Sequence, residues 1–164
     1  MRATDAIKAA LTSTQATLEW YLSDLSDADL LVRPCPGANH IAWQMGHMIV
    51  GESFLIRSEL LDAAYPDLPA GFAEQYGDAK AHDDSPAGWR TKAEYVDLSK
   101  RMRGATIAAL DEVTDADLDR ASTGRMAKFA PKLVDLFLLV SNHTLMHAGQ
   151  FTVVRRKLGK PVLF

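Results

Sequence analysis

The sequence predicts an all-α protein, a four-helix bundle with a long connection between its second and third helices. Four segments repeat apolar residues at steps of three and four, which is the period of an amphipathic helix. No segment shows the strict alternation of a half-buried strand. A stretch at 63–90 that contains several prolines and glycines separates the second segment from the third. The length of 164 residues fits one domain, so we expect a single domain over 1–164.

One regular stripe predicts the first helix. Thr4 or Asp5 is suited to cap its start, because a short polar side chain accepts a hydrogen bond from a free backbone N–H group. Thr14 is a polar member near the middle of the stripe. The members, which share one helix face, are Ile7, Leu11, Thr14, Leu18, Tyr21 and Leu25.

The second helix follows a breaker at 34–37, where two prolines and a glycine favour a loop. Asn39 is the predicted N-cap, and the helix should run from about His40 to Asp62. The residues spaced to face inward are Trp43, His47, Val50 and Phe54. The connection after this helix, at 63–90, is uncommonly long for a compact domain, and such segments are often functional. At ~3.3 Å per residue it is long enough to span a bundle from end to end.

The third helix should begin near Thr91, with Glu94 three residues later as a capping box, and a polar stretch at 115–124 should end it. The fourth should begin at Pro131, a residue favoured in the first turn, and run to about Leu158. Its inward stripe contains two histidines in positions that a bundle core usually gives to leucine or valine. The stripe is Leu136, Val140, His143, His147, Gln150 and Val154.

Three of the five histidines are candidate metal ligands. His143 and His147 are four residues apart, so their imidazoles share one helix face. His47 lies on the predicted inward face of the second helix. If the two stripes meet at one level, three nitrogen ligands converge, and one divalent cation would satisfy three buried polar groups that otherwise cost stability. Three neutral ligands plus an open position are typical of a catalytic zinc-type site.

The alternative is a structural bundle in which these histidines hydrogen-bond to Thr14, Gln44 or the backbone. The metalloprotease motif is excluded, because Thr144 follows His143 where that motif needs glutamate. Polar neighbours should fix the imidazole tautomers of a metal site. By helical position the candidates are Thr14, Gln44, Glu52 and Gln150, each of which could equally be an ordinary surface or boundary residue.

Composition excludes several classes of protein. The net charge of −3 argues against a general nucleic-acid binder, which usually has a basic surplus. The longest strongly apolar run, at 133–140, is far shorter than the ~20 residues of a membrane span, so we expect no membrane partner. Cys35 is the single cysteine, which rules out an internal disulfide and favours a cytoplasmic location.

Two motifs resemble those of a known family. Residues 36–48, PGANHIAWQMGHM, resemble the second-helix signature of the DinB-like superfamily. Residues 143–150, HTLMHAGQ, followed by RRKLGKP at 155–161, resemble its last-helix signature. The stretch from Thr91 to Leu110 and the long loop before it also fit, so the resemblance covers nearly the whole chain.

The resemblance implies a bundle whose second and third helices run parallel. It implies one divalent metal ion, nickel or zinc before iron or manganese, bound by His47, His143 and His147. It also implies a homodimer and, as the leading function, a metal-dependent transferase that uses a low-molecular-weight thiol. A metal-dependent hydrolase and a non-catalytic, stress-related metal-binding protein stay open as alternatives, and catalytic residues other than the ligands are not identified.

Overall fold

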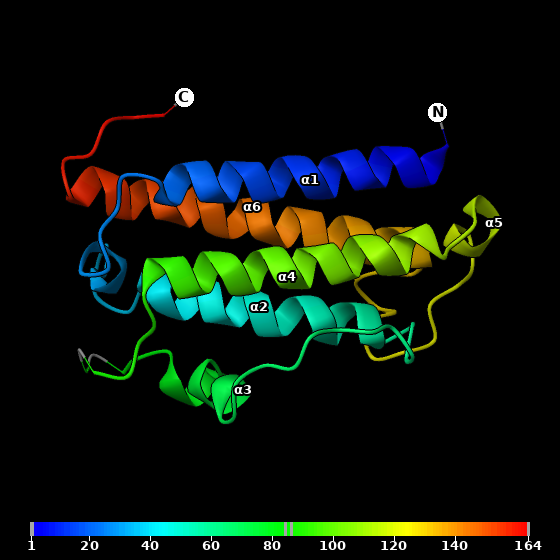
Figure 1. The fold of residues 1–164 in the computed structure, drawn as a ribbon, viewed down its shortest axis with the longest axis horizontal. Coiled ribbons are helices and arrows are strands. Elements are labelled where there is room, and N and C mark those ends of the chain that lie inside the picture. Colours follow the sequence, from blue (N-terminus) through cyan, green and yellow to red (C-terminus); the bar gives the residue numbers. More distant parts are fainter. Residues whose placement is uncertain (1, 84, 86, 164) are drawn as a thin grey trace.

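Four long helices dominate the computed structural model, which describes residues 2–83, 85 and 87–163 (Figure 1). They are α1 (Ala3–Leu22), α2 (Ile41–Arg57), α4 (Lys92–Asp111) and α6 (Leu133–Lys157). The short elements between them are η1 (Asp29–Leu31), α3 (Phe72–Gln75), η2 (Asp78–Lys80) and α5 (Asp115–Leu118). The described part of the chain contains no strand beyond one isolated bridge between Ala121 and Lys132, so the predicted all-α bundle is confirmed.

The long helices pack in a ring in which α1 lies between α6 and α4, and α2 lies between the same two helices. The consecutive helices α1 and α2 therefore occupy diagonal corners. The ribbon shows α2 and α4 running in one direction and α1 and α6 running in the other (Figure 1). The parallel second and third long helices agree with the expectation from the family resemblance.

The connection between α2 and α4 returns along the bundle and packs against α2. It carries α3 and η2, so it is partly ordered into helical turns. Tyr76 lies directly on Gly46, where a Cβ atom would come within 2.1 Å of the ring, so this close approach requires glycine. The Tyr76 hydroxyl then bonds the Tyr95 hydroxyl at 2.7 Å, which ties the connection to α4 as well.

Helix α2 is shorter than predicted, ending at Arg57 instead of near Asp62. No helix breaker stands at 58–62, so the reason is tertiary. The Glu59 carboxylate accepts the backbone N–H groups of Thr123 and Gly124 at 2.7 and 2.6 Å, which draws this residue towards the segment before α6. These long-range hydrogen bonds outweigh the local helix propensity of residues 58–62.

Two helix starts also differ from the prediction. Helix α2 is capped by His40, whose Nδ1 accepts the Trp43 N–H at 3.1 Å, and not by Asn39. Helix α6 begins at Leu133 with Lys132 as its N-cap, two residues after Pro131. The predicted capping box of Thr91 and Glu94 is present at the start of α4.

At the start of α1, Asp5 accepts the N–H of the N-cap residue Arg2 at 3.0 Å; Asp5 therefore contributes from inside the first turn instead of as the cap. Five of the six predicted stripe residues of this part of the chain are buried, Tyr21 being intermediate. The prediction for Phe54 is wrong, because its side chain is 43% exposed at the outer edge of α2.

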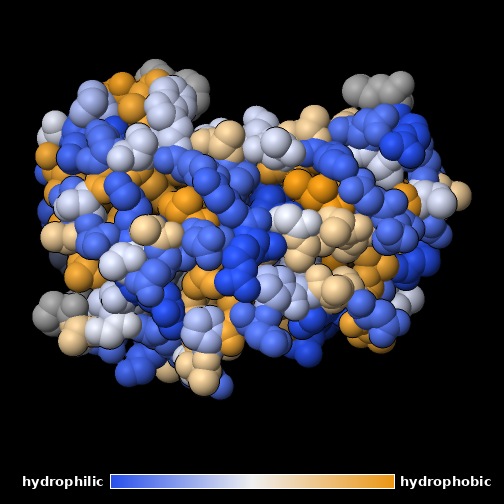
Figure 2. Space-filling view, in the orientation of Figure 1, coloured by the Kyte–Doolittle hydropathy of each residue, from blue (hydrophilic) through white to orange (hydrophobic). Residues whose placement is uncertain are grey.

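The surface seen in the orientation of Figure 1 is mostly polar, with apolar residues scattered between the polar ones (Figure 2). None of the helices in the described part of the chain is long and apolar enough to cross a membrane. The apolar interior forms two clusters, one around the first half of α2 and one around its last turns and the first half of α6.

Candidate metal centre

Helices α2 and α6, which pack side by side, bring the three predicted histidines together. One ring nitrogen from each of His47, His143 and His147 lies within 4.8 Å of the others. The Nε2 atoms of His143 and His147 face each other at 3.0 Å. Among the residues that the structure describes, no other group of three histidine, cysteine or acidic side chains comes this close.

Gln44 fixes the orientation of His147. The Gln44 amide nitrogen donates to the Asn39 carbonyl at 2.8 Å, which leaves the amide oxygen to accept. That oxygen lies 2.8 Å from Nδ1 of His147, so Nδ1 carries the proton and donates it. His147 therefore presents an unprotonated Nε2 to the centre, which is the tautomer that a metal ion needs.

The indole ring of Trp43 packs against the face of the His47 imidazole. The two rings stack with centroids 4.9 Å apart and an angle of 13° between their planes. Trp43 donates its indole N–H to the Gly77 carbonyl at 3.4 Å, so the connection at 58–91 braces this tryptophan. The position of His47 therefore depends on a segment that is remote in sequence.

Burial keeps the three imidazoles neutral. It lowers the pKa of His143 to about 4, with a further contribution from the charge of His47. It lowers the pKa of His147 to about 3, with smaller contributions from His143 and His47. The pKa of His47 is also lowered by burial, against a weak opposing effect of Asp78. Neutral imidazole is the form that binds metal, so no proton has to leave near pH 7.

These features fit a divalent ion. Two nitrogens bound to one zinc-type ion at ~2.1 Å lie roughly 3.0–3.4 Å apart, and the separation of His143 from His147 falls in that range. Without an ion the two nitrogens bond each other: the Nε2–H of His143 donates to the unprotonated Nε2 of His147. A cation shared by the three rings gives every inward lone pair a partner.

Glu52 and Thr14 belong to a second polar cluster, built around the buried Arg103 of α4. Glu52 accepts two hydrogen bonds from this guanidinium, at 2.7 and 3.1 Å. Thr14 accepts another at 3.0 Å. The remaining acceptors are the Leu11 carbonyl and the Thr144 hydroxyl, at 2.6 and 2.9 Å. Glu52 and Thr14 thus bond Arg103, with no bond to the histidines.

Gln150 is exposed on α6 and makes no hydrogen bond within the described residues. Of the four predicted polar neighbours, the structure therefore places one, Gln44, against a histidine. Helical periodicity did not identify Arg103 or Thr144 as members of a buried polar cluster. A signal for Arg103 was available, because an acidic residue such as Glu52 on a buried face requires a cationic or hydrogen-bonding partner. The signal did not identify which of the 18 basic residues supplies it.

His40 and His82 take no part in the centre. His40 caps α2 and packs edge-on against Trp89, with ring centroids 4.5 Å apart. His82 is exposed in the connection before α4. The geometry therefore separates the five histidines into three that converge and two that do not.

The family model of the DinB superfamily matches residues 10–151, and the chain belongs to this family. Two solved structures are similar over nearly the full length. A conserved protein from Enterococcus faecalis shares 18% sequence identity, with a TM-score of 0.71 and coverage of 98% of this chain and 99% of that chain. YfiT from Bacillus subtilis, described as a probable metal-dependent hydrolase with an unusual four-helix bundle topology, also shares 18% identity, with a TM-score of 0.68 and coverage of 96% and 89%.

At this level of identity the two structures establish a common fold and nothing about activity. No curated protein matches the chain.

Proposed function

We propose that the protein is a metal-dependent enzyme whose divalent ion is bound by His47, His143 and His147. The observation that carries the proposal is the convergence of three neutral imidazoles on one point, with His147 held in the metal-binding tautomer by Gln44. The inward Nε2 atoms of His143 and His147 bond each other, at 3.0 Å, so a cation has only this one hydrogen bond to displace before it can bind both rings.

The protein's own residues position the three rings and keep them neutral, with His147 buried and His47 and His143 half-buried. Gln44 orients His147, Trp43 stacks on His47, and the buried surroundings keep all three rings unprotonated. A bound divalent ion would supply Lewis acidity, which favours the thiolate form of a thiol or acidifies a water molecule. Three protein ligands leave a coordination position open for such a molecule.

The leading reaction is transfer of a low-molecular-weight thiol, and the second candidate is hydrolysis. The description of YfiT as a probable metal-dependent hydrolase supports the second candidate. The third candidate is a non-catalytic metal-binding protein with a role in stress. Nickel and zinc are the preferred ions, followed by iron and manganese, since neutral histidine sites accept several divalent ions.

Metal analysis of protein purified without a histidine tag tests the first step. We expect about one divalent ion per chain in the parent, and loss of that ion in His47→Ala and in His143→Ala. His82→Ala is the matched control, because this exposed histidine lies outside the cluster. Failure of the parent to bind nickel, zinc, iron or manganese on incubation would overturn the proposal.

Turnover assays separate the candidates. A panel of electrophilic and ester substrates is tested with and without an added thiol, in the metal-loaded and the metal-depleted protein. Turnover that needs both metal and thiol supports the transferase, whereas turnover that needs metal alone supports the hydrolase. Stoichiometric metal binding with no turnover in either condition supports the binding protein.

We further propose a cytoplasmic homodimer that pairs through the outer face of α6. Between Asp135 and Arg156 the exposed residues of this helix carry no charge, and depletion of charge is typical of homodimer interfaces. The large apolar residues on that face are Leu138, Leu145, Met146 and Val153.

Sedimentation analysis tests this assembly. Leu145→Glu should convert the dimer to a monomer, whereas Leu61→Glu, at an exposed leucine away from α6, should not. A monomeric parent at all concentrations would contradict the proposal.

A further inference from the structure

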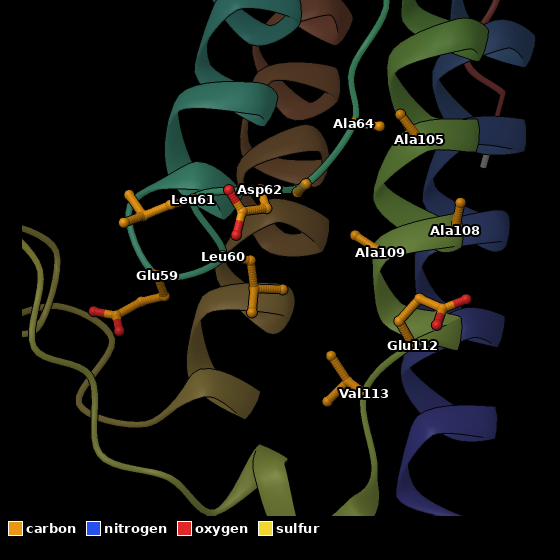
Figure 3. Close-up of a pocket in the computed structure, with 11 residues that line it drawn as sticks. Glu59, Leu60, Leu61, Asp62, Ala64, Ala105, Ala108, Ala109, Glu112 and Val113 are labelled. Carbon is orange, nitrogen blue, oxygen red and sulfur yellow. The ribbon is translucent and has the colours of Figure 1, made fainter.

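A groove lies beside the C-terminal end of α2, between the segment that follows this helix and the last turns of α4 (Figure 3). Its volume is about 650 Å³, within the range of about 300–1,000 Å³ that is typical of small-molecule sites. None of the three histidines lines it. Ala64 approaches Ala105 at one end (Figure 3), and next to it the Tyr65 hydroxyl bonds Thr106 at 2.8 Å. The groove is therefore bounded by an anchored chain segment.

The walls of the groove are apolar because α4 presents alanine there. Ala105, Ala108 and Ala109 leave the α4 wall without long side chains, and Figure 3 shows open space between them and the opposite segment. Leu60 and Val113 lie in the lining and pack against one of the two core clusters. An apolar group in the groove would therefore rest on a surface continuous with the protein core.

The charged side chains that line the groove are all acidic, although Arg57 lies beside it and donates to the carbonyl of the lining residue Ala63 at 3.0 Å. Three carboxylates line it, and no lysine, arginine or histidine does. Glu59 is already engaged by Arg120 and by the backbone of 123–124. Asp62 and Glu112 are exposed and lie on opposite walls (Figure 3), and their carboxylates have no hydrogen-bond or ion-pair partner in the described part of the chain.

We infer that this groove binds a small organic cation with an apolar body. The body would lie against the alanine wall and Leu60, and the cationic group would lie beside Asp62, with Glu112 on the opposite wall adding to the negative potential. A second copy of the chain is a poor occupant, because a protein of net charge −3 would bring like charges together at this acidic rim. The inference is independent of the metal centre.

Titration with three matched probes tests the inference: 2-naphthylmethylammonium, the neutral 2-naphthalenemethanol and the anionic 2-naphthoate. Binding is followed through the backbone amide NMR signals of the full-length protein. We expect the cation to bind about fivefold more tightly than the neutral alcohol, since two exposed carboxylates each contribute modestly, and the anion to bind most weakly. The preference should shrink at high salt.

Variants locate the site. Asp62→Asn combined with Glu112→Gln should abolish the preference for the cation while the neutral alcohol still binds. Asp97→Asn, at an exposed carboxylate near the opposite end of α4, is the matched control and should change nothing. Ala108→Trp should block all three probes by filling the groove from an exposed position.

Three results would overturn the inference. One is equal affinity for the cation and the alcohol, and another is no binding at all. The third is a set of shifted signals that lies away from 59–64 and 105–113. Because the double variant only neutralises exposed side chains, it keeps the test decisive even if Ala108→Trp fails to fold.

Discussion

Arg103 and His147 are buried to a similar degree, with 4% and 6% of their surfaces exposed, yet their polar atoms are used in opposite ways. Arg103 directs all five of its N–H donors to acceptors on the other three long helices. His147 bonds Gln44 through one nitrogen, and its other nitrogen bonds the equivalent nitrogen of His143, another candidate metal ligand.

The difference separates a structural cluster from a ligand site. A buried network whose members are all satisfied can stabilise and specify a fold without any further group. A cluster in which two imidazoles bond only each other can exchange that hydrogen bond for a shared cation. The Arg103 cluster links α4 to α1, α2 and α6, whereas the histidine cluster links only α2 and α6.

The largest expected effect is a loss of stability when the Arg103 cluster is broken. Arg103→Met leaves the Glu52 carboxylate buried without its partner, and breaking a buried ion pair costs about 3–5 kcal/mol. Denaturant unfolding monitored by circular dichroism measures the loss. Arg101→Met, at an exposed position of the same helix, should leave the midpoint unchanged. Comparable midpoints for the two variants would mean that the Arg103 cluster is not structural.

The histidine cluster should contribute to the free energy of unfolding only when metal is bound. In the presence of a chelator, His143→Leu should unfold within about 1 kcal/mol of the parent, because an apolar side chain replaces a half-buried ring and removes one hydrogen bond, to His147. With metal at 100 times its dissociation constant, the parent should gain about 2.7 kcal/mol and the variant nothing. Thermal unfolding with and without metal gives both values. A large loss in the chelated state would place this cluster in the same class as Arg103.

A substitution at Gln44 tests whether the hydrogen bond at Nδ1 of His147 affects metal binding at Nε2 of the same ring. Gln44→Leu removes the acceptor for Nδ1 of His147 and should weaken metal binding about 10–100-fold, as loss of such an orienting partner generally does. Competition with a chromophoric chelator measures the affinity. Gln150→Leu, at an exposed residue of α6, is the control, and equal affinities would show that the tautomer is set in another way.

The hydrogen-bonded carboxylate of Glu59 should contribute a smaller stabilisation, and this stabilisation should depend on pH. Burial by itself would raise the pKa of this carboxyl, but the N–H groups of Gly124 and Thr123, together with Arg120, lower it below its ordinary value. Because the folded pKa is the lower one, the stabilisation is present above the unfolded pKa of about 4.5 and is lost as the pH falls through the folded value.

Glu59→Gln should therefore cost about 1–2 kcal/mol at pH 7, and the difference from the parent should shrink in acid. Unfolding curves at pH 7 and pH 3 measure it. Asp62→Asn is the matched control, since this carboxylate three residues away accepts no hydrogen bond from any described residue. A difference that grows in acid would mean that folding raises the pKa of Glu59 instead of lowering it.

Much of the bundle follows from local pattern. The stripe from Ile7 to Leu18 is buried as predicted, and the Thr91–Glu94 box starts α4 where expected, because both depend on residues within a few turns. The end of α2 was missed for the opposite reason, since Glu59 is bound by a segment more than sixty residues away. Phe54 was misplaced because helical spacing identifies a shared face without showing which side of it meets a neighbour.

The sequence by itself determined the helices, the spacing of His143 and His147 on one face, and, through two family motifs, membership of the DinB superfamily. Tertiary structure decided which polar residues meet. It places Gln44 against His147, and Glu52 and Thr14 against Arg103, although all three were equal candidates for a histidine partner by helical position. The physical reason is that periodicity fixes the direction of a side chain about its own axis, whereas the partner it reaches depends on the rotation and level of the neighbouring helix.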